Sequence, residues 1–257
     1  MTQNRPPVDR SLLIEGLGKG LRVIEAFSDD WPRMTATECG ERTGLTRTAA
    51  RRYLMTLVHD GYADTDGKHY WLMPSVLRLG QSYLEAARLP RLVQPFLQRL
   101  SMHTGETANF SVLDGHDVVY LVRSNSPRVV SIGFQVGARM PAHAVSPGTA
   151  VLSTWSPEAL EAWLATHDYL KFNAATVGDA DRLRERVERA RQQGYIRLEQ
   201  QVDVGLGGLA VPLVDRKGRC VGALSITFQA QAYPEETCLQ RLLPPLQEAS
   251  QALRPIV

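Results

Sequence analysis

The sequence has few cysteines, and they lie far apart. Only three occur among 257 residues, at Cys39, Cys220 and Cys238. They form no Cys-x-x-Cys pair, and no histidine stands at ligand spacing from them, which argues against a zinc site. We therefore expect neither a metal nor a cofactor. Sparse cysteine usage suits a reducing compartment, so we expect a cytoplasmic protein.

Long hydrophobic runs and an excess of one charge are also missing. No apolar run approaches 18 residues and no signal-peptide pattern occurs, which disfavours membrane insertion and export. The 29 basic and 27 acidic residues give a net charge of only +2. Affinity for nucleic acid must then come from a local basic cluster. With 44% hydrophobic residues, the chain can build two modest domains or one large one.

Recognisable catalytic patterns are absent as well. Ser146-Pro147-Gly148 lacks the Gly-x-Ser-x-Gly elbow, although His143 stands nearby. The glycines of 204–209 do not have nucleotide-loop spacing, and a strand rather than a helix follows them. We predict no catalytic residues and no enzyme. The alternative is an enzyme that turns over a small acid in its second domain, with the first domain serving only protein contacts.

The most informative segment that is present is the basic stretch 46–59. At helical spacing Ala50, Leu54, Leu57 and Val58 form one apolar stripe. No acidic residue occurs between positions 43 and 59. Such a helix suits the major groove of DNA, where an arginine side chain can donate two hydrogen bonds to one guanine base. We predict base contacts from Arg47, Thr48, Arg51 and Arg52, and phosphate contacts from Thr46 and Lys68. The alternative is a surface helix with solvated arginines.

The residues before this segment predict two further helices. Leu17, Leu21, Ile24 and Phe27 share one face of an amphipathic helix. Thr35 and Glu38 have the spacing of a capping box at the start of the next helix. Gly44 is suited to end that helix, and Thr46 to cap the basic one. Two helices joined by so short a turn form a helix-turn-helix arrangement.

A predicted β-hairpin follows the basic helix. Strand-like runs at 62–65 and 69–72 flank Asp66-Gly67, a strong hairpin signal. Lys68 stands at the tip, where a cation can reach phosphate. Helices followed by a basic-tipped hairpin predict a winged helix-turn-helix domain over residues 1–73. Residues 1–11 form its loose N-terminal arm.

The remaining chain predicts a linker helix at 74–87 and an α+β domain at 88–257. Paired strand-like runs separated by helices argue for a mainly antiparallel sheet. The expected strands are 107–113, 118–122, 129–134, 195–202, 208–214 and 219–228. The expected helices are 92–104, 146–155 with Ser146 as its cap, 179–193, a further one starting at Ser156-Pro157, and a C-terminal one from Pro234 that is interrupted at Pro244-Pro245.

Several motifs resemble those of the IclR family of bacterial transcriptional regulators. They are Gly18-Lys19-Gly20-Leu21, Gly44-Leu45-Thr46, the run 57–62 and Leu77-Arg78-Leu79-Gly80. The run 47–52 is most similar to the branch that controls breakdown of protocatechuate and 4-hydroxybenzoate. The resemblance implies a GAF-like effector-binding domain at 88–257. It further implies a ligand-responsive regulator of aromatic catabolism that acts at the nucleoid.

The expected partners are a palindromic operator in double-stranded DNA, a small organic acid, aromatic by the resemblance, and further copies of the chain as a homodimer or tetramer. A homo-oligomer also follows from physics, because one winged helix buries too little surface for high specificity and paired half-sites multiply it.

Five residues are candidates for contacts with the effector. The resemblance places the effector near the loop that contains His143, although an ordinary buried or loop histidine is the alternative. Ser146 stands at a helix N-terminus, where it either contacts a carboxylate or simply caps the helix. Arg123 either pairs an acidic ligand or forms a structural salt bridge. Phe110 and Phe134 either line the pocket or fill the core.

The loop at 143–148 departs from the pattern of the aromatic-catabolism branch. That branch usually has Tyr-Cys-Thr-Ser-Met-Gly, whereas this chain has His-Ala-Val-Ser-Pro-Gly. Smaller residues and an imidazole stand where the ligand is expected, and Pro147 removes a backbone donor. These changes in the loop allow an effector that differs from the acids usual for the branch.

Overall fold

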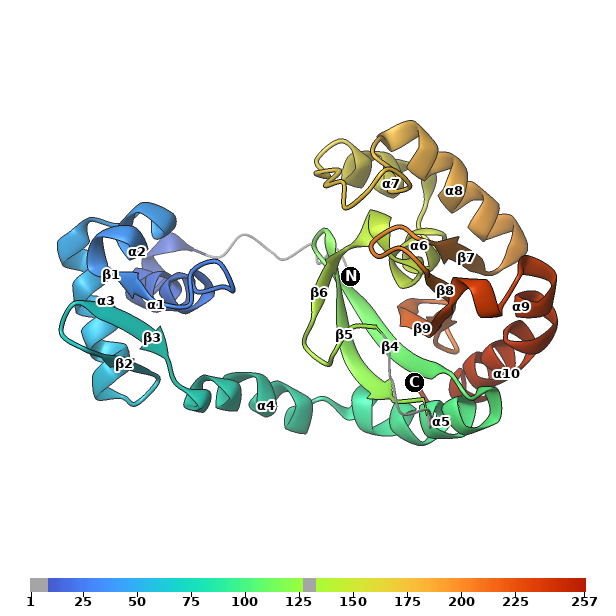
Figure 1. The fold of residues 1–257 in the computed structure, drawn as a ribbon, viewed down its shortest axis with the longest axis horizontal. Helices are drawn as coiled ribbons and strands as arrows, with labels where there is room; N and C mark the ends of the chain where they lie inside the picture. Colours follow the sequence, from blue (N-terminus) through green and yellow to red (C-terminus); the bar gives the residue numbers. More distant parts are fainter. Residues whose placement is uncertain (1–8, 127–132) are drawn as a thin grey trace. The chain divides into compact units, whose positions relative to one another are not determined.

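The computed structural model describes residues 9–126 and 133–257, and the chain divides into two compact units. The first unit ends at Ala86 and the second starts at Ala87 (Figure 1). Helices and antiparallel strands occur in both units, so the predicted α+β class is confirmed. Among the described residues, no helix has both the length and the apolarity that crossing a bilayer requires.

The N-terminal unit is a winged helix-turn-helix. Its elements are η1 (Arg10–Leu12), α1 (Glu15–Glu25), β1 (Met34–Thr35), α2 (Ala36–Thr43), α3 (Arg47–His59), β2 (Ala63–Thr65), β3 (His69–Leu72), η2 (Pro74–Val76) and α4 (Leu77–Ala86). The three strands form an antiparallel sheet in the order β1-β3-β2. The strands β2 and β3 form the predicted hairpin.

Local hydrogen bonds set the boundaries of the helix-turn-helix. Glu38 donates its backbone N–H to Thr35 Oγ1 over 3.3 Å, and Thr35 N donates to Glu38 Oε2 over 2.7 Å. Gly44 ends α2 with a φ of 69°, and Thr46 accepts from Ala49 N over 3.2 Å to cap α3. The capping box, the glycine stop and the second cap are therefore confirmed.

The first helix buries a different face from the one its leucines predict. Val23 is fully buried, whereas Leu17 is 65% and Leu21 46% exposed. A Cβ on Gly20 would lie 3.8 Å from the Tyr53 ring, so a glycine surface lets α1 approach α3. The predicted apolar face is thus only partly buried within one chain.

The C-terminal unit is built on a six-stranded antiparallel sheet in the order β6-β5-β4-β9-β8-β7. Its strands are β4 (Thr107–Asp114), β5 (Asp117–Ser124), β6 (Arg139–Pro141), β7 (Ile196–Glu199), β8 (Leu206–Val214) and β9 (Cys220–Gln229). Its helices are α5 (Arg88–Thr104), η3 (Ala142–Ala144), α6 (Ser146–Leu152), α7 (Pro157–Leu164), α8 (Ala180–Gln193), η4 (Ala230–Ala232), α9 (Glu235–Arg241) and α10 (Leu243–Leu253).

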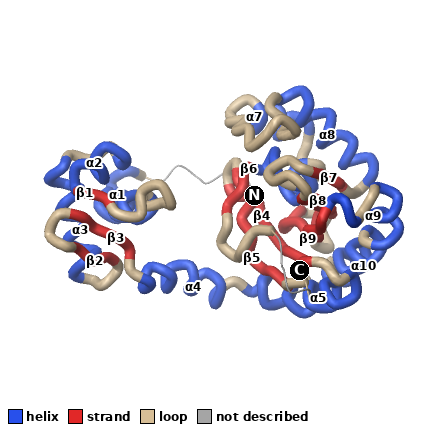
Figure 2. Tube along the Cα trace, in the orientation of Figure 1, coloured by secondary structure: helices blue, strands red, loops and turns tan. Residues whose placement is uncertain are grey.

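The two faces of this sheet differ in chemistry. Side chains of α5, α9 and α10 pack on one face against fully buried residues such as Phe110, Leu209 and Phe228, which form the main core. The other face is covered by α6, with α7 and α8 beyond it (Figure 2). Small and polar residues face that side, including Asn109 and Ser225, which pair in register between β4 and β9. This asymmetry leaves room for a cavity on the α6 side.

Two predicted features differ from the structure. Most of the strand expected at 129–134 lies outside the described residues, and Gly133 and Phe134 stand in a loop, while β6 forms the sheet edge. Ser146 was predicted to cap the following helix. It is instead the first residue of α6, which has no side-chain cap. By contrast, Ser156 caps α7 as predicted.

Candidate functional site

The exposed face of α3 is basic. All six predicted DNA-contacting side chains belong to exposed residues, namely Thr46, Arg47, Thr48, Arg51, Arg52 and Lys68. Behind them Ala50 and Leu54 are fully buried against α1 and α2. Burial of one stripe holds the helix in place and leaves its cations in solvent.

These cations are not neutralised within the described part of the chain. Arg47, Arg51, Arg52 and Lys68 form no ion pair there. By contrast, Arg182, Arg184 and Arg191 of α8 are each paired with a carboxylate. Unpaired guanidinium groups on a rigid helix are available for bidentate hydrogen bonds to base edges or phosphates.

The tip of the hairpin is organised by Asp66. Its carboxylate accepts from His69 N over 2.7 Å and from Lys68 N over 2.9 Å. These two backbone N–H groups lower the pKa of Asp66 to about 2. The carboxylate therefore stays ionised and holds the tight turn, while the Lys68 side chain extends into solvent.

The C-terminal unit contains a cavity on the α6 face of the sheet. Its volume is about 450 Å³ with the space open to solvent included. Tyr120, Ser225 and Thr227 line it from the strands, and residues 144–147, where η3 leads into α6, line it from the α6 side. The segment 198–203, which ends β7 and leads to β8, forms a third wall.

The cavity combines an aromatic wall with hydroxyl groups. The Tyr120 and Phe134 ring centroids are 5.2 Å apart. Burial raises the pKa of Tyr120, so its phenol remains a neutral hydrogen-bond donor. Glu199 is ion paired with Arg197. A flat, polar-edged molecule of one ring suits such a lining.

The structure brings only some of the predicted effector residues to this cavity. Phe134 and Ser146 line it. Arg123 donates from Nη1 to the carbonyl oxygen of Phe134, so it stands behind the aromatic wall. Phe110 is fully buried in the core on the opposite face of the sheet, because successive side chains of β4 alternate between faces, and it does not line the cavity.

His143 is fully buried and also lies outside the lining. Its Nδ1 is 2.7 Å from His167 Nε2, and its Nε2 is 2.9 Å from the Leu170 carbonyl oxygen. Burial, followed by the nearby Arg186 charge, lowers the pKa of His143 although the Leu170 contact opposes this. The imidazole therefore holds residues 142–144 in place through its contacts with His167 and the Leu170 carbonyl oxygen.

Sequence reasoning missed Tyr120, Ser225, Thr227 and the 198–203 wall. A signal was present in β9, where Ser225 and Thr227 interrupt an apolar strand at every second position. Polar residues with a period of two mark one face of a strand. Their partners on β4, which complete the polar face, lie more than 100 residues away.

The described residues contain no group of three or more His, Cys, Asp and Glu side chains arranged to hold a metal ion.

Known families match both units. The IclR helix-turn-helix domain matches residues 16–67, and the bacterial transcriptional regulator IclR C-terminal domain matches residues 81–254.

Curated relatives extend this match over nearly the whole chain. The p-hydroxybenzoate hydroxylase transcriptional activator of Acinetobacter baylyi is 37% identical over 249 residues, covering 95% of this chain and 92% of the relative. The Pca operon regulatory protein of the same organism is 33% identical over 259 residues, covering 99% and 93%.

The crystal structure of an IclR homolog from Microbacterium hydrocarbonoxydans complexed with 4-hydroxybenzoate has a TM-score of 0.72 to this chain. It is 27% identical and covers 93% of this chain and 97% of its own. The matched families and the curated relatives are transcriptional regulators, which excludes the enzyme alternative. Together these matches place the chain in the IclR family of bacterial transcriptional regulators, with a DNA-binding unit followed by a C-terminal regulatory domain.

Proposed function

We propose that this regulator binds a palindromic operator as a homodimer or tetramer and that a small aromatic acid changes its occupancy. The observation that carries the DNA-binding part is the set of exposed arginines on α3, which have no acidic partner among the described residues. Arg47, Thr48, Arg51 and Arg52 read base edges in the major groove. Thr46 and Lys68 contact phosphate, since the Thr46 oxygen already accepts from Ala49 N and its hydroxyl hydrogen remains to donate.

Exposed apolar surface supports an oligomer. On the N-terminal unit Leu12, Leu13, Ile14, Leu17 and Leu21 are all at least 46% exposed. On α4 Leu77 is 75% and Tyr83 52% exposed, and none of its residues is buried. Adjacent apolar side chains of this kind are typical of protein interfaces. We propose that residues 74–87 link the DNA-binding unit to the effector-binding domain. Most of the arm expected at residues 1–11 lies outside the described residues, which begin at position 9.

The relatives and the cavity support an aromatic acid as the effector. One relative is named for p-hydroxybenzoate hydroxylase, and a similar structure is a complex with 4-hydroxybenzoate. The cavity offers the rings of Tyr120 and Phe134 with hydroxyls around them. Because the effector must favour one state of the protein, its binding shifts the population that occupies the operator.

Footprinting on the DNA upstream of its own gene, with and without 4-hydroxybenzoate, tests the whole proposal. We expect two protected half-sites whose centres are about 10 base pairs apart, or a multiple of this, and a change in occupancy when the acid is added. A single protected half-site, or occupancy that no aromatic acid alters, would contradict it.

Lys68→Ala should weaken binding to all duplexes about equally. If each Lys68 contacts one phosphate, the slope of log affinity against log salt concentration becomes shallower by about 1 per DNA-bound protomer, or about 2 for a dimer on two half-sites. Fluorescence anisotropy on operator and scrambled duplexes over a salt series measures this. Loss confined to the operator would instead indicate base readout by Lys68.

Phe134→Ala should weaken the effector about three- to tenfold, because it removes half of an aromatic pair at the cavity wall. Thermal shift with a panel of aromatic acids measures this, since ligand at one hundred times its Kd stabilises the wild type by about 2.7 kcal/mol. Phe172→Ala is the matched control, as Phe172 is 37% exposed and lies outside the cavity lining. Equal shifts in the two variants would remove Phe134 from the site.

A further inference from the structure

Three histidines form a continuous chain of hydrogen bonds behind the cavity wall. His116 Nδ1 is 3.0 Å from His167 Nδ1, and His167 Nε2 is 2.7 Å from His143 Nδ1. The chain ends at the Leu170 carbonyl oxygen on one side and at Thr166 Oγ1, 3.4 Å from His116 Nε2, on the other.

The Leu170 carbonyl sets the direction of this chain, because a carbonyl oxygen only accepts. His143 Nε2 must therefore donate, which leaves its Nδ1 to accept from His167 Nε2. His167 Nδ1 then accepts from His116 Nδ1, which leaves His116 Nε2 as an acceptor that faces Thr166 Oγ1. The Thr166 hydroxyl also lies within hydrogen-bond distance of the Trp163 and Ala162 carbonyl oxygens, so its one hydrogen is shared among these acceptors.

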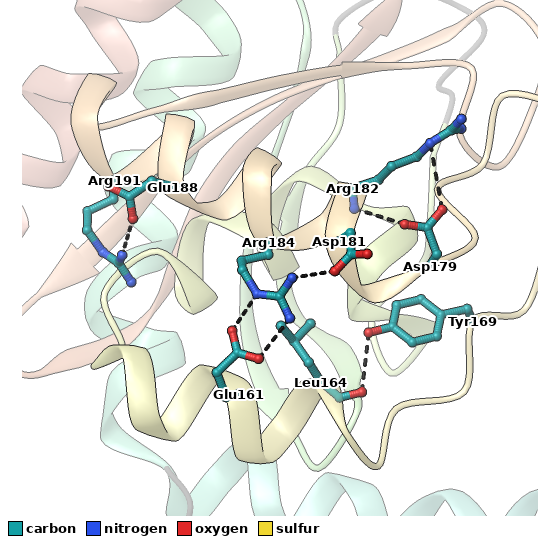
Figure 3. Close-up of polar contacts among 9 residues, drawn as sticks. All are labelled: Glu161, Leu164, Tyr169, Asp179, Asp181, Arg182, Arg184, Glu188 and Arg191. Carbon is teal, nitrogen blue, oxygen red and sulfur yellow. Dashed lines mark hydrogen bonds and ion pairs between the residues drawn. The ribbon is translucent and has the colours of Figure 1, made fainter.

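The chain is packed into the cap formed by α7 and α8. Trp163 stacks on His167 with ring centroids 4.1 Å apart and donates to the Gly115 carbonyl over 3.0 Å. Arg184 of α8 holds α7 through a two-pronged ion pair with Glu161, and it also contacts Asp181 (Figure 3). The histidines therefore occupy a braced position.

The same cap connects the chain to two walls of the cavity. Arg186 donates from Nη1 to the His143 carbonyl over 3.0 Å and from Nη2 to Gln201 Oε1 over 2.8 Å. Gln201 lines the cavity, as does the loop 144–147 that directly follows His143. A charge on the histidine chain would thus arise just behind the lining.

Among the described residues, the cavity lining has no basic side chain, and its charged residues are the acids Glu199 and Asp203. In that part of the chain, positive charge that compensates an anionic ligand comes from behind the walls. Arg123 and Arg186 stand there permanently, and the histidine chain can add a charge by taking up a proton.

We infer that the His116–His167–His143 chain takes up a proton when an anionic effector binds, so that effector affinity rises as the pH falls. This inference rests on the proposed function, because it requires a carboxylate ligand in the cavity. One added proton is accommodated by reversing the direction of two bonds: His116 then donates from Nε2 to Thr166 Oγ1 and accepts at Nδ1 from a doubly protonated His167. The half-buried His116 gives the proton its route from solvent.

Burial and the neighbouring groups keep His167 and His143 neutral without a ligand. Burial, then His143 and His116, lower the pKa of His167 to about 4. Of the groups that face the chain, Arg186 opposes a proton on His143, and Asp168 favours it. Tyr169 contacts His143 and His167 through its ring. On the hairpin of His116, both Asp114 and Asp117 are already paired with Arg139.

A carboxylate on the order of 10 Å away raises the proton affinity of the chain roughly tenfold at an effective dielectric constant of about 20. Protein–proton linkage then makes binding about twofold tighter at pH 5 than at pH 8. A neutral ligand of the same shape should show no such dependence.

Calorimetric titration of the full chain from pH 5 to pH 8, in buffers of different ionisation enthalpy, tests this. The probes are 4-hydroxybenzoate and its uncharged amide, 4-hydroxybenzamide. We expect proton uptake with the acid and none with the amide. His167→Asn should abolish the uptake, and His116→Asn, at the half-buried end, should do the same with less risk to folding. His103→Asn is the control, because His103 is an exposed histidine of α5.

Uptake that persists in both His167→Asn and His116→Asn, or that is equal for the acid and the amide, would overturn the inference and leave the proposed function intact. Tight binding of the acid without proton uptake in the wild type would do the same. If no aromatic acid binds at any pH, the proposed effector class fails first, and the inference fails with it.

Discussion

The double variant Arg51→Ala/Arg52→Ala should lose operator-specific binding. Both side chains are exposed on α3 and unpaired among the described residues. Each one that makes a bidentate hydrogen bond to a base contributes about 1–3 kcal/mol to the free energy of binding the cognate site. Their joint loss should weaken the cognate complex by about 30-fold or more for each half-site, because two contacts of at least 1 kcal/mol are removed from each one. Fluorescence anisotropy on operator and scrambled duplexes at fixed salt gives the measurement.

Two further variants separate base readout from charge. Arg51→Lys/Arg52→Lys retains both charges but loses the planar fork, so binding to scrambled DNA should survive while specificity falls. Arg216→Ala removes one exposed arginine from the turn between β8 and β9, and it should bind the operator as the wild type does. If the double alanine variant loses operator and scrambled binding by the same factor, these arginines contact only phosphate.

The helix-turn-helix was predictable because its signals are local. Thr35 and Glu38 are three residues apart, and the hydrogen bonds they exchange need no information from elsewhere in the chain. Gly44 and Thr46 act in the same way at the turn. The buried face of α1 was harder to predict. Helical periodicity alone cannot show whether an apolar stripe is covered by the same chain or by a second copy.

The cavity depends on contacts that no local pattern contains. Ser225 faces Asn109 only because β9 pairs with β4 in that register. Ser146 could be singled out because it begins a Ser-Pro-Gly motif, and it does line the cavity. Phe110 could not be assigned to a face without knowing which side of β4 meets α5 and α10.

His143 illustrates a different limit. Its position in the loop before α6 was noticed in the sequence, but its partners were not, because His167 and His116 come from separate segments. The imidazole faces away from the cavity, yet the backbone that follows it forms the cavity wall. A residue can thus belong to a binding site through its effect on the main chain rather than by touching the ligand.

Gly148→Ala should disrupt this wall more than any small substitution in the lining. A Cβ at Gly148 would lie 2.1 Å from the Ala142 carbonyl oxygen and 2.6 Å from the Ala142 Cα. Both are backbone atoms, so no side-chain rotation relieves the overlap and the loop 142–147 must move. Overpacking of this kind costs about 1–3 kcal/mol or more. In a unit of this size it lowers Tm by about 2–4 °C per kcal/mol.

Because the displaced loop carries Ser146 and the His143 carbonyl held by Arg186, effector affinity should fall at least tenfold in this variant, roughly the effect of 1.4 kcal/mol. Calorimetry or differential scanning fluorimetry with 4-hydroxybenzoate measures both changes. Gly80→Ala is the matched control, because a Cβ on Gly80 in α4 meets nothing within 4 Å and alanine favours a helix. Operator binding without effector reports whether the DNA-binding unit is still folded. A Gly148→Ala protein with wild-type Tm and effector affinity would show that residues 142–147 move to accommodate the added Cβ at little cost. Close backbone packing would then not shape the cavity.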